Sequence, residues 1–398
     1  MSNKFIAVEL FSGGGGLAVG LRNAKFSVAA AVELAPHAAA TFAANHKGVR
    51  VFQQDVRTVG GKSLKKVAGG KIDLLAACPP CQGFSSLTSK YAREDERNDL
   101  VLEVGRLAAE MKPAAIMMEN VPGLAHRGKK LLDQLVRKLK SIGYIVNWDV
   151  LQVADFGVPQ LRRRFVLLAG LGFEIKLPKP THARVPIGKL KPYRTVRDAI
   201  GHLDGAITFT EAKDRGGAAR FNWHVVRTLS PENVIRLKLA KPGAQGQELP
   251  EHVRPSCHQN GYKGFSNVYG RLSWDQPSAT ITAGCTTLSK GRFGHPKEQR
   301  TISLREAALL QTFPANYKFD TEHMERACEI VGNALPCLFA EVIARQCRLA
   351  IAKQTKSAPR QKPRARVSRA KAGKALAERI GAAGRTSKTN RPAKKRAR

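Results

Sequence analysis

The chain has 398 residues, and its 67 Lys and Arg against 31 Asp and Glu give a formal net charge of +36. A chain of this length can bury a full core and divide into two domains. The charge favours a polyanionic partner, and no apolar run approaches the roughly 20 residues of a membrane span, so composition argues against a membrane protein.

The cysteines indicate the compartment of the protein. There are seven of them, an odd number without regular spacing. This usage is typical of reduced thiols rather than of a disulfide framework. We therefore expect a cytoplasmic protein.

The first 23 residues predict a strand, a glycine turn and a helix. Residues 5–10 are an apolar run, residues 11–16 contain four consecutive glycines, and residues 17–23 have a helical pattern. Within the turn, Gly13 and Gly15 combine with Ala18 in the G-x-G-x-x-A spacing of a nucleotide-type loop. Missing side chains in such a loop let a ligand approach the N-terminus of the helix.

Two acids follow the next two predicted strands. The strand over residues 27–33 ends in Glu33, about 20 residues after the glycine turn, where a carboxylate can bind a ribose hydroxyl. The strand over residues 49–52 leads to Asp55. Either acid alone is more often a helix cap or a surface charge, but the series of strand ends places both on one sheet edge. The ligand is then a dinucleotide or S-adenosylmethionine.

A fourth strand, predicted over residues 72–77, is followed by a cysteine in a rigid setting. Pro79 and Pro80 prevent the strand from continuing. Cys81 therefore lies at the carboxyl edge of the sheet, where open α/β sheets bind their ligands. A thiol in this position is a candidate nucleophile.

Cys81 has three other interpretations. It can be a small buried apolar side chain, a redox partner of Cys78, or half of a zinc site. The next cysteine is Cys257, so a second closely spaced ligand pair is missing. Residues 83–85 have the composition of a loop, whereas a redox motif normally begins a helix.

Charged residues also flank two later strands. An apolar strand over residues 114–118 precedes Glu119, and a strand over residues 165–168 follows three consecutive arginines. Such a run ordinarily binds phosphate or faces solvent. Because alternate residues of an extended segment point the same way, however, Arg162 and Arg164 can both point inward.

The last third of the chain changes character twice. Alternating strands and helices give way to proline, glycine and scattered bases over residues 187–296, and a helical pattern returns over residues 300–314. Residues 330–350 predict a turn and a final helix. From residue 353 the chain has 17 Lys and Arg and one acid, a net charge of +16 that leaves +20 on the remainder. We expect this tail to be a disordered electrostatic arm.

Six segments together resemble the ordered motifs of DNA (cytosine-5) methyltransferases of the bacterial type. They span nearly all of residues 5–345. In chain order they are residues 10–17 (LFSGGGGL), 79–85 (PPCQGFS), 119–121 (ENV), 160–164 (QLRRR), 305–307 (REA) and 332–334 (GNA).

The resemblance implies an α/β fold, the Rossmann-like fold of S-adenosylmethionine-dependent methyltransferases. A catalytic domain would occupy residues 1–186 and 297–352, a smaller target-recognition domain residues 187–296, and the disordered basic tail residues 353–398. The implied partner is double-stranded DNA, bound by a monomer without metal or membrane, in the cytoplasm and associated with the nucleoid. The implied role is in restriction-modification or as an orphan epigenetic enzyme.

The resemblance also implies where the cofactor binds. S-adenosyl-L-methionine, released as S-adenosyl-L-homocysteine, would place its methionine part on the glycine turn, its ribose at Glu33 and its adenine near Leu34 and Asp55. The implied cofactor-binding residues are Phe11, Ser12, Gly13, Gly15, Gly16, Leu17, Glu33, Leu34, Asp55, Val56, Pro80, Leu100, Asn333 and Ala334.

The implied catalytic residues are Cys81, Glu119, Arg162 and Arg164. A cytosine ring becomes nucleophilic at carbon 5 when a thiolate adds to carbon 6, which is the role of Cys81. Glu119 would supply a proton at N3, Arg162 would bind the O2 oxygen, and Arg164 would support the pocket. The base must first leave the duplex, and residues 82–98 would close over it.

Two alternatives stay open at this stage. One is an RNA-directed relative that methylates cytosine in tRNA, and the other is a non-catalytic DNA-binding homologue. The form of residues 79–85 and the size of the recognition interval favour DNA. The presence of Cys81, Glu119 and Arg162 argues against a protein that has lost catalysis.

Overall fold

The computed structural model describes residues 4–80, 99–244, 246–259 and 267–357. The described residues up to Gln354 belong to one compact unit. Predictions for Cys81, for residues 82–98 and for the tail beyond residue 357 fall outside the described residues. The predicted domain boundaries within this unit stay predictions.

A seven-stranded sheet carries the first half of the chain, in the order β3-β2-β1-β4-β5-β7-β6. All neighbours are parallel except that β7 runs antiparallel to both β5 and β6. The carboxyl ends of β1, β2, β4 and β5 therefore meet at one edge, together with the start of β7. The strands are β1 (Phe5–Leu10), β2 (Phe26–Val32), β3 (Arg50–Phe52), β4 (Leu74–Ala77), β5 (Ala115–Asn120), β6 (Tyr144–Gln152) and β7 (Arg163–Leu171).

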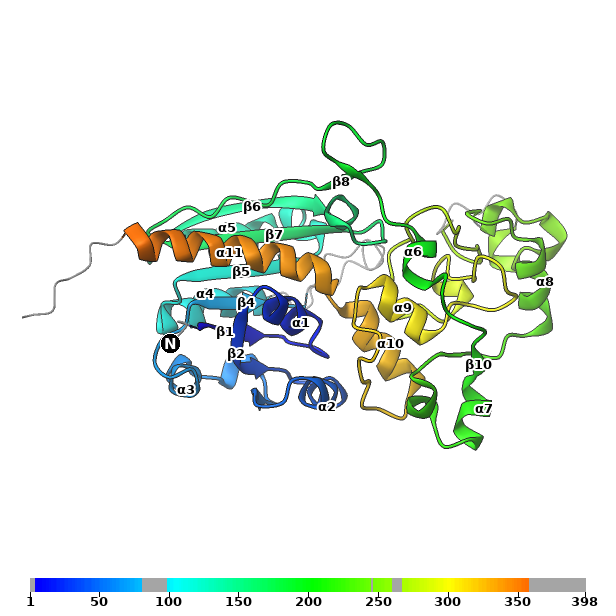
Figure 1. The fold of residues 1–398 in the computed structure, drawn as a ribbon, viewed down its shortest axis with the longest axis horizontal. Coiled ribbons are helices and arrows are strands. Elements are labelled where there is room, and N and C mark those ends of the chain that lie inside the picture. The colour runs from blue at the N-terminus through cyan, green and yellow to red at the C-terminus, as the bar shows by residue number, and fades with distance from the viewer. Residues whose placement is uncertain (1–3, 81–98, 245, 260–266, 358–398) are drawn as a thin grey trace, which may run out of the picture. The chain divides into compact units, whose positions relative to one another are not determined.

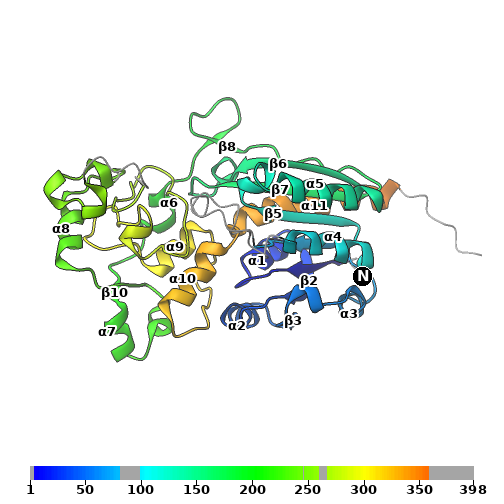
Figure 2. The ribbon, with the colours of Figure 1, turned by 180° about the vertical axis from the view of Figure 1, so that it is seen from behind.

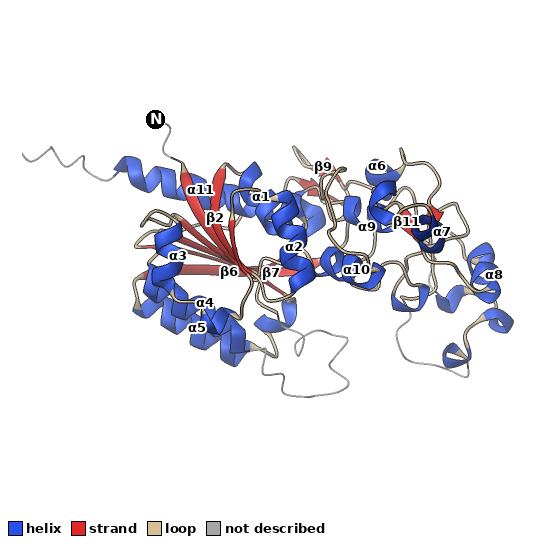
Figure 3. Ribbon diagram, turned by 90° about the horizontal axis from the view of Figure 1, so that it is seen from below, coloured by secondary structure: helices blue, strands red, loops and turns tan. Residues whose placement is uncertain are grey.

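Helices cover both faces of this sheet, which confirms the predicted α/β class (Figure 3). One face is covered by α1 (Gly16–Asn23), α2 (Pro36–Asn45) and α11 (Cys337–Ser357). The other is covered by α3 (Gly61–Val67), α4 (Leu100–Met111) and α5 (Lys129–Ser141). Strands covered on both sides are apolar throughout, as the fully buried LLAA of β4 illustrates.

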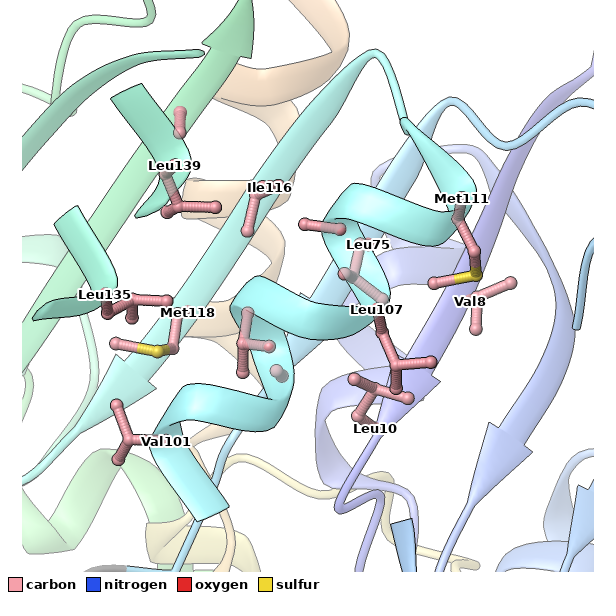
Figure 4. Close-up of a cluster of buried hydrophobic side chains, with 14 of the residues drawn as sticks. Val8, Leu10, Leu75, Val101, Leu107, Met111, Ile116, Met118, Leu135 and Leu139 are labelled. Carbon is pink, nitrogen blue, oxygen red and sulfur yellow. The ribbon is translucent and has the colours of Figure 1, made fainter. Parts of the chain in front are cut away.

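Figure 4 shows the core between the sheet and α4 and α5. Side chains from alternate strand positions meet the apolar faces of the two helices, and each large buried side chain contributes about 1.5–3 kcal/mol to stability. This core makes the strand ends a rigid platform. The labelled side chains are Val8, Leu10, Leu75, Val101, Leu107, Met111, Ile116, Met118, Leu135 and Leu139.

Residues 196–334 form a second cluster of elements with a separate core around Trp223 and Phe293 (Figures 1 and 2). Its helices are short and the segments that connect them are irregular. The loss of alternating strand and helix patterns over residues 187–296 predicts this. The helices are α6 (Val196–Ile200), α7 (Phe209–Asp214), α8 (Pro231–Leu239), α9 (Leu304–Leu310) and α10 (Met324–Asn333). Two-residue strands are β8 (His182–Ala183), β9 (Lys191–Pro192), β10 (Ile207–Thr208) and β11 (Val225–Val226).

Short 3-10 turns complete the chain. The described ones are η1 (Val56–Thr58), η5 (Pro122–Ala125), η6 (Val153–Phe156), η7 (Ala218–Phe221), η8 (Gly246–Glu248), η9 (Glu251–Val253), η10 (Ser256–His258) and η11 (Leu288–Lys290).

Three element boundaries differ from the sequence-based prediction. Glu119 lies inside β5 rather than after it, because the pairing with β7 continues to Asn120. The helix predicted over residues 300–314 is limited to α9, since Ser303 caps it in a capping box with Glu306. Residues 330–350 contain the end of α10, a short turn and most of α11.

One helical stretch, Met324–Thr355, is long and apolar enough by length and composition to cross a membrane. The sequence-based reading did not expect such a stretch. It consists of α10 and α11, and 67% of its apolar window is buried inside the protein. Burial of this kind is typical of a core helix.

Candidate functional site

A cleft of about 2060 Å³ opens at the carboxyl edge of the sheet. The loops after β1, β2, β3, β4 and β5 and the start of β7 form one wall, and parts of residues 258–335 form the other. Small-molecule sites usually enclose about 300–1,000 Å³. This cleft therefore has room for a small ligand and for part of a second molecule.

The cleft brings together nearly all the predicted site residues that the structure describes. Gly15 is the exception, and Cys81 lies outside the described residues. The predicted residues that line the cleft are Phe11, Ser12, Gly13, Gly16, Leu17, Glu33, Leu34, Asp55, Val56, Pro80, Leu100, Glu119, Arg162, Arg164, Asn333 and Ala334.

We call residues 11–17, 33–35 and 55–57 the glycine-loop side of the cleft. Gly15 acts there as a packing position, since its φ is 92° and an added Cβ would lie 2.5 Å from His46 Nε2. The same Cβ would lie 2.6 Å from the Tyr317 hydroxyl. Only glycine fits both restrictions, so Gly15 supports the loop, and its predicted contact with the ligand stays a prediction.

His46 and Tyr317 hold this loop from behind. The Tyr317 hydroxyl donates to the Gly14 carbonyl oxygen (2.6 Å), and His46 Nε2 lies 3.2 Å from the Gly15 carbonyl oxygen. Burial, with a contribution from the charge of Arg22, lowers the pKa of His46 to about 4. The imidazole is therefore neutral near pH 7. Sequence reasoning missed both residues, because neither belongs to a local motif.

Glu33 ties the end of β2 to the glycine loop. Its carboxylate accepts a hydrogen bond from the Gly13 N–H (2.7 Å) and another from the Ala35 N–H (2.8 Å). Hydrogen bonds of this charged kind are stronger than neutral ones. The carboxylate is thus held in place, and its remaining lone pairs are free to accept from a ligand hydroxyl.

Asp55 and Leu34 differ in their availability to a ligand. The Asp55 carboxylate accepts from the backbone and the guanidinium of Arg57, at 2.9 Å and 2.6 Å, and these hydrogen bonds lower its pKa. Leu34 is 61% exposed in the cleft, an unusual setting for a large apolar side chain. Leu34 therefore offers an open apolar surface, whereas Asp55 is largely engaged by Arg57.

We call Glu119, Arg162 and Arg164 the arginine side of the cleft. Arg164 Nε lies 2.7 Å from Glu119 Oε1, and both side chains are nearly buried. Burial lowers the pKa of Arg164, while the charge of Glu119 opposes this effect. Arg163, which lies between Arg162 and Arg164 in the chain, is exposed. The expected alternation of inward and outward arginines is therefore confirmed.

Arg162 connects three distant parts of the chain. Its Nη1 donates to the carbonyl oxygens of Ile281 (2.7 Å) and Gly332 (3.3 Å), and burial lowers its pKa well below the usual range. Its Nε is buried and has no hydrogen-bond partner among the described residues. A buried donor without a partner is costly, so an acceptor on a ligand that reached it would be stabilised.

Gly332 allows α10 to approach the segment that Arg162 holds. A Cβ at Gly332 would lie 2.1 Å from Ala283 N and 2.1 Å from the Thr282 carbonyl carbon. The two backbones can touch only because residue 332 lacks a side chain. This contact brings Thr282 and Ala283 into the cleft wall, which the sequence did not predict.

Two contacts concern the residues just before Cys81. Asn120 Nδ2 donates to the Pro79 carbonyl oxygen (3.1 Å), so β5 holds the chain two residues from the predicted nucleophile. Cys78 also lines the cleft. Burial and then the charge of Glu119 raise the pKa of the Cys78 thiol well above its usual value, so Cys78 is unsuited to act as a thiolate.

Bases outnumber acids on the cleft wall. The basic side chains that line the cleft are Arg57, Arg127, Arg162, Arg163, Arg164, Lys290 and Arg292. The acidic side chains that line it are Glu33, Asp55, Glu119 and Glu329. Such a wall attracts an anionic ligand. Among the described residues, no group of three or more His, Cys, Asp or Glu side chains is placed to hold a metal ion.

Known proteins resemble this chain over most of its length. Residues 5–348 match the family model of the C-5 cytosine-specific DNA methylases. The Type II methylase M.HgiDII of Herpetosiphon aurantiacus is 35% identical over 86% of this chain and 94% of its own length. The Type II methyltransferase M1.HphI of Haemophilus parahaemolyticus is 33% identical over 85% of each chain.

Solved structures share the fold. A putative DNA modification methyltransferase encoded within an E. coli prophage superposes with a TM-score of 0.66 at 22% identity, over 87% of this chain and 99% of that one. A mutant of Spodoptera frugiperda DNMT2 superposes with a TM-score of 0.58 at 17% identity, over 86% of this chain and 99% of that one. The predicted Rossmann-like methyltransferase fold is confirmed.

Proposed function

This chain belongs to the C-5 cytosine-specific DNA methylase family, and we propose that it methylates carbon 5 of a cytosine flipped out of a short duplex sequence. Several relatives are named as Type II methyltransferases, and we assign this chain the same kind of role. The observation that carries the proposal is the buried Glu119–Arg164 pair, 2.7 Å apart, in the cleft that Pro79 and Pro80 also line.

The glycine-loop side fits S-adenosyl-L-methionine, the cofactor that this family uses generally. The held carboxylate of Glu33 suits ribose hydroxyls, and the exposed side chain of Leu34 suits an adenine face. A Cβ at Gly13 would have no neighbour within 4 Å, which leaves space beside the loop for the methionine part. The bound cofactor supplies an electrophilic methyl group on a sulfonium sulfur.

Cys81 is the proposed nucleophile. Its thiolate adds to carbon 6 of the cytosine, and the electron pair of the 5,6 double bond moves into the ring so that carbon 5 becomes nucleophilic. Asn120 supports this role by fixing the Pro79 carbonyl two residues earlier. The raised pKa of Cys78 argues against that neighbour as the nucleophile.

The arginine side is proposed to bind and polarise the base. Glu119 delivers a proton to N3 as the ring accepts charge, and Arg164 orients the Glu119 carboxylate. The unused Nε of Arg162 donates to the O2 oxygen of the base. These contacts act on atoms whose charge grows during the addition, so they lower the barrier rather than merely retain the base.

The last step regenerates the thiolate. After carbon 5 has accepted the methyl group, water or hydroxide removes the proton that remains on carbon 5. The electron pair restores the 5,6 double bond, the Cys81 sulfur leaves carbon 6 with the electron pair of the broken bond, and N3 returns its proton to the Glu119 carboxylate. Neither carbon is accessible within a duplex, so the base must swing out of the stack, at a cost of a few kcal/mol.

A tritium-transfer assay tests the function. The full chain is incubated with methyl-tritiated cofactor and either duplex DNA or tRNA, and the labelled base is identified after hydrolysis. The proposal predicts 5-methylcytosine in DNA only. Label in tRNA alone would establish an RNA-directed enzyme, and no label in either substrate would establish a non-catalytic homologue.

The variant Cys81→Ser sharpens this assay. Removing the nucleophile should lower transfer at least about 10³-fold, while duplex binding stays near the wild-type level. Cys78→Ser is the matched control and should retain transfer. Normal turnover by Cys81→Ser would contradict the mechanism, even if DNA proved to be the substrate.

A further inference from the structure

Residues 181–193 form a loop that projects beside the end of β6 (Figures 1 and 2). At its base the strands β8 and β9 pair, and near its tip the Leu190 N–H donates to the Ile187 carbonyl oxygen. Gly188 has a φ of 64°, which helps the chain to reverse direction. We call this segment the projecting loop.

The projecting loop lies in a strongly basic stretch. Residues 175–197 contain seven Lys and Arg and no acid. Within the loop, Arg184, Lys189 and Lys191 are exposed. In the part of the chain that the structure describes, none of the three takes part in an ion pair. Their charges are therefore available to an external anion.

The tip of the loop is apolar and exposed. Val185 is 70% and Ile187 is 76% exposed, more than any other large apolar side chain in the described residues. Two aliphatic side chains cover far less than the roughly 1,000 Å² that a stable protein interface requires. A small apolar tip flanked by cations fits nucleic acid better. Proteins that bind the minor groove combine apolar side chains that wedge between base steps with Arg and Lys side chains.

The base of the loop is tied to the segment that carries the arginine side. Asp155, in η6, accepts from the Thr181 N–H with its carbonyl oxygen (2.8 Å) and from the Tyr193 hydroxyl with its carboxylate (2.5 Å). Burial and this contact raise the pKa of Tyr193 to about 12. Just before η6, the Gln152 side chain accepts from the Arg162 N–H (2.7 Å). The loop is thus fixed at both ends next to the cleft.

We propose that the projecting loop is a second duplex-binding element, in which Arg184, Lys189 and Lys191 bind phosphates and Val185 and Ile187 contact base edges in the minor groove. The proposal rests on the proposed function and adds a contact outside the target site. Six residues separate Thr181 from the tip, a reach of at most about 20 Å. With a rise of about 3.4 Å per base pair, the contact lies within about six base pairs of the loop base.

The first test removes the charges. The triple variant R184A/K189A/K191A is compared with K62A/K66A/K140A, which removes three exposed charges from α3 and α5. The probe is a duplex of about 40 base pairs that carries the methylated site found by methylome sequencing. The loop variant should raise the KM for DNA about 10-fold or more and reduce the salt slope of binding by about 2–3. Its kcat and its KM for the cofactor should match those of the control.

The second test removes the apolar tip. V185S/I187S should weaken duplex binding several-fold without changing the salt slope, because no charge is lost. Stepwise shortening of the duplex flanks should weaken binding by the wild type once a flank no longer reaches the loop, and should leave the loop variants unaffected. Both changes are on exposed side chains, so the melting temperature should stay at the wild-type value.

The outcomes separate this inference from the proposed function. If the wild type transfers no methyl group to DNA, the proposed function fails. If the wild type methylates DNA and both loop variants match the control in KM, salt slope and flank dependence, the projecting loop does not bind DNA. A changed sedimentation coefficient of the free variant, with unchanged DNA binding, would instead assign the tip to contact with a second copy.

Discussion

The two sides of the cleft are held by different kinds of contact. On the glycine-loop side, Gly13 meets Glu33 only 20 residues away, and Asp55 meets Arg57 two residues away. On the arginine side, Arg162 meets Ile281 and Gly332 across 119 and 170 residues. Apart from the contact of Tyr317 with Gly14 across 303 residues, the first side depends on neighbouring strands, whereas the second requires nearly the whole chain to be folded. We therefore expect changes on the arginine side to affect catalysis and stability together, and changes on the glycine-loop side to affect mainly the cofactor.

Glu119→Gln should have the largest effect. The substitution removes the proton donor for the base and leaves Arg164 buried without its carboxylate. We expect kcat to fall about 10²–10⁴-fold, measured by single-turnover tritium transfer. Glu110→Gln breaks a comparable Glu–Arg pair on the exposed face of α4 and should leave kcat unchanged. Similar kcat values for the two variants would remove Glu119 from the mechanism.

Arg162→Lys should have the next largest effect, and on two properties at once. Lysine keeps the charge, but its ammonium group lacks the planar fork of the guanidinium. It cannot contact the Ile281 and Gly332 carbonyl oxygens and the base at the same time. We expect kcat/KM for DNA to fall about 10–10²-fold and the free energy of unfolding to fall by about 1–3 kcal/mol. Urea denaturation and steady-state kinetics measure the two losses. A loss in kinetics alone would mean that the long-range contacts do not hold the cleft together.

The pH dependence of stability should reveal His46 on the glycine-loop side. Its pKa is about 4 in the folded protein against 6.5 for an ordinary histidine, so the unfolded chain binds more protons between these values. Stability is then complete above about pH 6.5 and is lost as the pH falls towards 4, by up to about 3 kcal/mol. Thermal melts from pH 7 to pH 4 should show a shallower decline for His46→Asn. Equal declines in both proteins would show that His46 does not titrate in this window.

Glu33→Gln should have the smallest effect, confined to the cofactor. The neutral amide weakens the hydrogen bond from the Gly13 N–H. We expect the KM for the cofactor to rise about 10-fold, with kcat retained at saturation. Asp55→Asn should change this KM less, because Arg57 already engages that carboxylate. A fall in kcat of Glu33→Gln at saturating cofactor would show that the two sides are coupled.

The sequence predicted the glycine-loop side well because its signals are local. The glycine turn, the strand before it and Glu33 lie close together in the chain, and the structure brings them together as expected. Motif order also placed Glu119 and Arg164 in one cleft, although their pairing joins β5 to β7. The roles of these residues stay predictions until they are tested.

Other features could not be read from the sequence, because they arise where distant segments meet. The approach of Gly332 to Thr282 and the support of the loop by His46 and Tyr317 produce no periodic pattern in the chain. The packing of Gly15 against His46 and Tyr317 is also absent from the local pattern, because a glycine in a turn serves ligand approach and close packing equally well. Thr282 and Ala283, which also line the cleft, lie in an irregular region, where spacing carries little information.

A duplex containing 5-fluorocytosine at the target base tests the central claim most directly. Fluorine cannot leave as a proton does, so the sulfur cannot depart from carbon 6 after methyl transfer. Mass spectrometry should show one covalent protein–DNA complex per duplex, dependent on the cofactor, with the modified peptide mapped to Cys81. An adduct on Cys78, or none at a site that the enzyme methylates when it carries cytosine, would contradict the account.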